Sequence, residues 1–159
     1  MGILYTNSDG LQQHYGTRAV SQGAGEKTGT AFTKTITLDF DGVGLVDTTP
    51  IIDRSQARLP KGAYIKSVTL LVENAFTSGG AATLDVGTFK ASDGTVLDID
   101  GFIAASAVAG LTAGADIADA GAQVGTIIAE DTYIVPTYNT AVFTAGKGRL
   151  VVEYQMSIE

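Results

Sequence analysis

The chain has 159 residues, no cysteine and a formal net charge of -7 from 17 acidic and 10 basic residues. This length suits one domain with a sizeable core, and the lack of cysteine excludes disulfides, thiolate catalysis and the usual structural zinc sites. The acidic balance disfavours nucleic acid and anionic membranes as partners. Neither a basic leader nor a sufficiently apolar stretch is present, so we expect no signal peptide and no membrane anchor.

Residues 1–30 are polar and glycine-containing, with no sustained period of 2 or 3.6. This pattern predicts an extended N-terminal arm that lacks a core and becomes ordered on a partner. We therefore divide the chain into an arm, residues 1–30, and a β-sandwich domain, residues 31–159. The arm's candidate contact residues are five apolar side chains that can fill grooves and one cation, namely Ile3, Leu4, Tyr5, Leu11, Tyr15 and Arg18.

The composition changes at Ala31, where apolar and polar residues begin to alternate. Residues 31–40 predict the first core strand, because one face collects the apolar side chains Phe32, Ile36, Leu38 and Phe40. The connection that follows, residues 41–63, contains Pro50 and Pro60. Proline cannot donate to a strand ladder, so we expect a loop with one short edge strand here.

A series of strands separated by turns is predicted next. Residues 64–74 form a strand with Val68, Leu70 and Val72 on one side. A Ser-Gly-Gly turn at residues 78–80 leads into a strand over residues 82–89. The Asp-Gly pair at residues 93–94 supplies the positive φ angles of a tight hairpin, and residues 95–99 return as its second strand. The other Asp-Gly pairs, 9–10, 41–42 and 100–101, are also interpreted as turns.

The pattern is weaker over residues 101–125. Residues 102–111 favour a short helix, capped by Asp100 and with Gly110 at its C-terminal exit, over the alternative of a packed loop of small residues. Further strands are expected at residues 123–129, 132–135 and 141–144. The C-terminal strand is clear, because Leu150, Val152, Tyr154 and Met156 alternate with polar residues or Val151. About eight strands predict an all-β fold of two packed antiparallel sheets.

Candidate chemical groups are few, and each has a simpler explanation. His14 is the only histidine and lies in the arm, without a nucleophile motif elsewhere. Residues 23–30 resemble a phosphate-binding loop, but Glu26 precedes Lys27 where such a loop has glycine. The aspartates at positions 39, 41, 93, 98 and 100 resemble fragments of calcium loops, although turns explain them better. We therefore expect no enzyme activity and no cofactor. Binding of an ion at a junction between subunits is an alternative that stays open.

Four segments carry a resemblance to a known family: residues 59–76, residues 83–102, QVGTIIAEDTYIV at residues 123–135 and FTAGKGRLVVEY at residues 143–154. Together they resemble capsid decoration, or cement, proteins of tailed phages. The resemblance implies a jelly-roll β-sandwich, a homotrimer, and the major capsid protein as partner. It also implies a location on the outer capsid surface of the virion, after synthesis in the bacterial host cytoplasm.

Two other function classes remain as alternatives. A receptor-binding module, or the tip of a head fibre or tail fibre, could use the same fold. A small hydrolase is the third, and it would need a constellation of groups around His14.

Overall fold

The computed structural model describes residues 3–6, 12–15, 33–45, 57–119 and 121–156. The chain falls into two compact units, Met1–Ala31 and Phe32–Glu159, and each is considered by itself. In the first unit, β1 (Ile3–Thr6) pairs with β2 (Gln12–Tyr15) in an antiparallel register that sets Ile3 opposite Tyr15 and Leu4 opposite His14. The backbone of this part of the predicted arm therefore forms a short strand pair.

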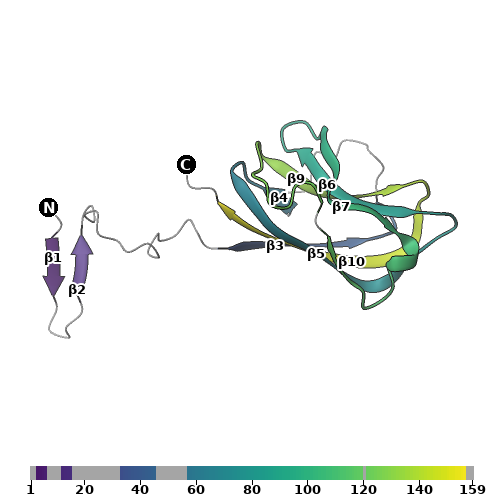
Figure 1. The fold of residues 1–159 in the computed structure, drawn as a ribbon, viewed down its shortest axis with the longest axis horizontal. Coiled ribbons are helices and arrows are strands. Elements are labelled where there is room, and N and C mark those ends of the chain that lie inside the picture. Colours follow the sequence, from purple (N-terminus) through teal and green to yellow (C-terminus); the bar gives the residue numbers. More distant parts are fainter. Residues whose placement is uncertain (1–2, 7–11, 16–32, 46–56, 120, 157–159) are drawn as a thin grey trace. The chain divides into compact units, whose positions relative to one another are not determined.

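The second unit is a sandwich of two four-stranded antiparallel sheets (Figure 1). One sheet has the order β3-β10-β5-β8 and the other has the order β4-β9-β6-β7. The strands are β3 (Lys34–Asp41), β4 (Arg58–Leu59), β5 (Ala63–Ser78), β6 (Thr83–Lys90), β7 (Val96–Ala107), β8 (Asp116–Asp119), β9 (Thr132–Asn139) and β10 (Phe143–Met156). Successive strands change sheets at every connection except β6 to β7, which is the jelly-roll arrangement. The predicted all-β jelly-roll sandwich is confirmed.

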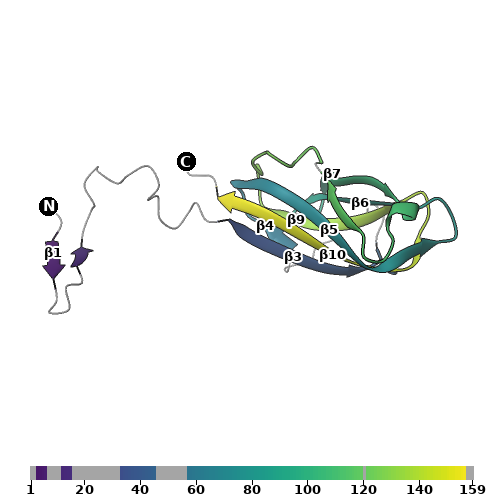
Figure 2. The ribbon, with the colours of Figure 1, turned by 60° about the horizontal axis from the view of Figure 1, so that its bottom comes forward.

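The core lies between the two sheets, which Figure 2 shows as two layers. Leu70 and Val152 of the first sheet are fully buried, as are Leu84 and Ile134 of the second. Near the end of β5, Phe76 packs against Phe40 and Phe143, with ring centroids 6.1 and 5.2 Å apart. These three rings fill the core at one end of the sandwich. Burial of such aliphatic and aromatic side chains is the main favourable term in folding.

Most of the strands expected from the sequence are confirmed, although several are longer than expected. Leu38 and Phe40 are buried on β3 while Thr35 and Thr37 are exposed, as the alternation predicts. The connection after β3 contains the expected short edge strand, β4, at the margin of its sheet. The hairpin between β6 and β7 is confirmed, and Gly94 has a φ of 73°. Asp93 does not have a positive φ, so the tight turn with two positive φ angles is wrong, and a longer loop joins Lys90 to Val96. Phe32 and residues 46–56 lie outside the described residues.

The helix expected over residues 102–111 is wrong. β7 continues through Ala107, and only Val108–Gly110 form a single 3₁₀ turn. Phe102 and Ile103 are fully buried and Ile103 pairs with Val86 of β6, so burial and strand pairing outweigh the helix preference of the alanines. The alternative of a packed loop is also wrong for residues 101–107.

Two further expectations need correction. Residues 123–129 form turns with an isolated bridge between Tyr64 and Ile127, rather than a strand. The Asp-Gly pair at residues 100–101 is not a turn but part of a bulge within β7, where the register steps from Thr88↔Asp98 to Val86↔Ile103. Between these two pairs one residue of β6, Gly87, thus opposes four of β7, residues 99–102. The strand expected at residues 141–144 begins only at Phe143, and β8 was not anticipated.

Candidate functional site

The described residues contain no group of three or more His, Asp or Glu side chains placed to hold a metal ion. His14 belongs to β2, and residues 23–30, the segment resembling a phosphate-binding loop, lie outside the described residues. No helix within the described residues is long and apolar enough to cross a bilayer. Among the described residues, the features to consider are exposed surfaces and a pocket.

The candidate contact residues of the arm are only partly placed by the structure. Ile3, Leu4 and Tyr5 lie in β1, and Tyr15 lies in β2. Leu11 and Arg18 lie outside the described residues. The backbone register brings the two strands together, and the role of these six residues stays a prediction.

An ion-pair network crosses the exposed face of the β3-β10-β5 sheet. Arg149 of β10 bonds Asp39 of β3 at 2.6 and 3.1 Å and lies 3.3 Å from Glu73 of β5, which also pairs with Lys147 at 3.1 Å. The guanidinium of Arg149 lowers the pKa of Asp39, and Glu73 raises the pKa of Lys147. These cations are occupied by neighbouring carboxylates, so this face offers little free charge to a partner.

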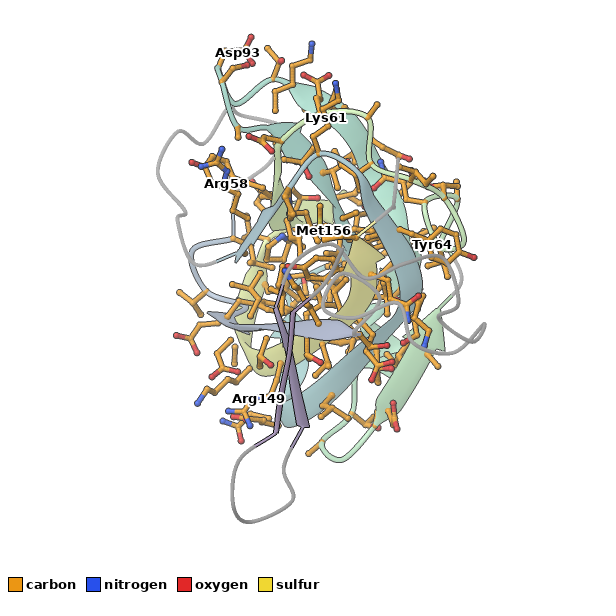
Figure 3. All side chains as sticks on the ribbon, turned by 90° about the vertical axis from the view of Figure 1, so that its left-hand side faces the viewer. Arg58, Lys61, Tyr64, Asp93, Arg149 and Met156 are labelled. Carbon is orange, nitrogen blue, oxygen red and sulfur yellow. The ribbon has the colours of Figure 1, made fainter. Side chains whose placement is uncertain are left out.

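A second ion pair lies at the end of the sandwich where β5 begins and β10 ends, the end seen in Figure 3. Asp131 accepts a hydrogen bond from the backbone N–H of Lys61 at 2.8 Å and another from Arg58 at 2.5 Å. The Lys61 N–H, then the Arg58 guanidinium, lower the pKa of Asp131. The pair joins the short edge strand β4 to the loop before β9. Tyr64 points outward on the opposite side of this view from Arg58 (Figure 3).

A pocket of about 220 Å³ opens at this end of the sandwich. Strands contribute Thr88, Leu97 and Thr132, and the loop between β8 and β9 contributes Gln123, Thr126, Ile127, Ile128, Ala129 and Glu130. Thr88 and Thr132 lie on the core side of β6 and β9, in step with Val86 and Ile134. Thr88 is fully buried and Thr132 is 1% exposed. The pocket therefore combines buried hydroxyls with an aliphatic wall.

The pocket loop is fixed to both sheets by backbone hydrogen bonds. Ile65 at the start of β5 donates to Thr126 and accepts from Gly125, while the Gln123 N–H donates to the carbonyl of Gly101 on β7. A side chain at Gly101 would come within 2.6 Å of Asp98 Oδ2 and 2.7 Å of Gln123 Cδ, and one at Gly121 would meet the Gly101 backbone. Glycine is thus needed at position 121, where backbone atoms lie too close, whereas a side chain at position 101 would displace the ends of the Asp98 and Gln123 side chains. The sequence analysis missed this loop because these glycines look like ordinary turn residues.

The sequence matches no protein-family profile and no curated protein. The structure is similar to a chain in the cyanophage Pam1 capsid asymmetric unit, with a TM-score of 0.53 and 22% identity over 88% of this chain and 94% of that chain. It also has some likeness to a chain in the capsid of Ralstonia phage GP4, with a TM-score of 0.49 and 20% identity over 79% of this chain and 86% of that chain. The chain shares its fold with a component of a phage capsid.

Proposed function

We propose that the protein is a capsid decoration, or cement, protein that binds the outer surface of a tailed-phage head and stabilises the shell. The observation that carries the proposal is the jelly-roll fold, which aligns with a chain of the cyanophage Pam1 capsid over 94% of that chain. A match over nearly the whole of both chains supports a shared virion role more strongly than the fold alone, because jelly rolls also serve unrelated functions.

The proposed assembly is a homotrimer. Both sheets end in strands that are unpaired on one side within the described residues: β3 and β8 in one, β4 and β7 in the other. Exposed apolar side chains include Val43 (62%), Val142 (56%) and Ile127 (55%). Closed symmetry is one way to cover open sheet edges and apolar surface of this kind.

The proposed anchor is the arm, residues 1–30, with the sandwich as the body of the trimer. The arm has apolar residues that suit grooves on a partner, and the cation Arg18 suits acidic groups on the shell. The proposed contacts are Ile3, Leu4, Tyr5, Leu11, Tyr15 and Arg18, and the proposed partner is the major capsid protein of the head.

Binding of purified protein to phage heads that lack it tests this function. The full chain should sediment with the heads and raise the temperature at which they rupture. A variant with the five apolar contact residues replaced by serine keeps the length of the arm and should stay in the supernatant. A matched control replaces Gln12 and Gln13 by alanine and should bind normally.

Two outcomes separate the parts of the proposal. Binding of the serine variant with unchanged affinity would move the attachment site from the arm to the sandwich loops. Failure of the full chain to bind heads, together with its absence from purified virions by mass spectrometry, would overturn the decoration role itself. Where the full chain binds, imaging of decorated heads locates the protein on the shell.

A further inference from the structure

We infer that the pocket formed by β6, β7, β9 and the loop between β8 and β9 binds a neutral, hydroxyl-rich ligand of the size of one sugar ring. The lining residues named above form this pocket, and two of its polar atoms have no hydrogen-bond partner in the protein: Gln123 Oε1 and Thr132 Oγ1. Both atoms are buried, and buried polar groups are nearly always hydrogen-bonded. Their common position in one pocket indicates a ligand that bonds to both.

The orientation of Gln123 is set by the protein. Its side-chain Nε2 donates to Thr88 Oγ1 at 2.8 Å, and its backbone N–H donates to Gly101 at 2.9 Å. These bonds leave Oε1 as an acceptor. The Thr132 hydroxyl can donate or accept, so the pair is suited to a ligand that carries both hydroxyl hydrogens and oxygen lone pairs.

The remaining lining defines the charge and shape of the ligand. Among the described lining residues there is no lysine or arginine, and the single ionisable side chain is Glu130, 3.5 Å from Lys90. An anionic ligand such as a phosphate would find no counter-charge, whereas a hydroxyl can donate to the carboxylate. Leu97, Ile127, Ile128 and Ala129 supply an aliphatic wall suited to the C–H face of a sugar ring.

The size of the pocket limits the ligand to a small one. Its volume of about 220 Å³ exceeds the roughly 30 Å³ share of one water molecule and falls below the roughly 300–1,000 Å³ of pockets for drug-sized ligands. The wall has no aromatic ring, so stacking is absent and binding is weak, in the millimolar range. This inference does not depend on the capsid role.

Nuclear magnetic resonance of the full chain tests the inference, with glucose, galactose, mannose and N-acetylglucosamine as separate probes at millimolar concentration. At least one probe should shift the Gln123 side-chain amide and the Ile127 and Ile128 methyl signals, and should receive saturation from those methyls. Sodium phosphate at the same ionic strength serves as the anionic comparison and should leave these signals in place.

Two variants link the binding to the pocket. Thr132→Val removes a hydroxyl without changing the shape of the side chain and should weaken binding about tenfold, the effect of one hydrogen bond. Ile127→Ala removes an exposed part of the wall, keeps the fold, and should also weaken binding. The matched control Thr69→Val on β5, outside the lining, should bind as the parent does.

The inference is overturned if none of the four probes shifts the pocket signals. It is also overturned if the shifts map elsewhere, or if Thr132→Val and Ile127→Ala both bind as tightly as the parent. In these cases water alone satisfies Gln123 and Thr132. Shifts produced by phosphate but by no sugar would likewise reject a neutral ligand.

Discussion

The side-chain carboxylate of Asp85 accepts a hydrogen bond of 2.6 Å from the backbone N–H of Ala105. Asp85 lies on β6 and is 6% exposed, and Ala105 lies on β7 with a φ of 48°, in the left-handed region. The register between the strands shifts here, from Leu84↔Ser106 to Val86↔Ile103. Asp85 thus satisfies an amide that the bulge in β7 removes from the ladder.

Replacement of Asp85 tests this role and its pH dependence. Burial raises the pKa of Asp85, so the folded protein holds a proton on this side chain more tightly than the unfolded chain does. The stability that this protonation contributes is fully present below the ordinary pKa of 3.8, and it is lost as the pH rises through the raised pKa. Asp85→Asn keeps the acceptor without a charge, so its stability relative to the parent should improve as the pH rises. Urea unfolding of both proteins at several pH values from about 4 to 7 measures the difference.

Asp85→Ala is the companion variant, because it leaves the Ala105 N–H without its acceptor. We expect a loss of about 1–3 kcal/mol in the free energy of unfolding at neutral pH. Equal losses for the asparagine and alanine variants at neutral pH would contradict the proposed hydrogen-bonding role.

Gly87 should not tolerate alanine. A side chain there would overlap the backbone of Asp98 and Ile99, where the wide bulge of β7 lies against β6. We expect Gly87→Ala to lower the free energy of unfolding by about 1–3 kcal/mol, as overpacking does. Gly110→Ala is the control, because nothing lies within 4 Å and its φ is not positive. Similar unfolding curves for the two variants would show that the bulge moves freely.

Core truncations should be costly and a surface truncation nearly neutral. Leu70 and Val152 are fully buried in neighbouring strands, so either change to alanine should cost about 2–4 kcal/mol. Thr35 is exposed on β3, and Thr35→Ala should change the free energy of unfolding by less than about 0.5 kcal/mol. Chemical denaturation followed by far-ultraviolet circular dichroism provides the measurement.

The proposed homotrimer predicts that the melting temperature depends on protein concentration. Association stabilises the folded state by mass action, so the melting temperature should rise over a hundredfold increase in concentration. Native mass spectrometry should show three copies. A constant melting temperature with only monomer at micromolar concentration would count against the assembly.

The sequence by itself determined the strongest strands, because their alternation is local. The period-2 pattern at Leu38 and Phe40 and again at Leu150 and Val152 requires one buried face, whatever the rest of the chain does. Asp93-Gly94 likewise identifies a hairpin, because glycine adopts a positive φ without the steric cost of a Cβ, as Gly94 does. These local signals were enough to predict an all-β sandwich.

The secondary structure and the packing of the small residues depend on tertiary contacts. Residues 101–107 contain good helix formers, yet burial of Phe102 and Ile103 beside β6 keeps them in a strand. In the sequence Gly101 and Gly121 look like ordinary turn residues, but in the structure they allow the pocket loop to approach β7. The pocket brings Thr88, Gln123 and Thr132 together, although they are far apart in the chain. A local sequence pattern cannot predict contacts of this kind.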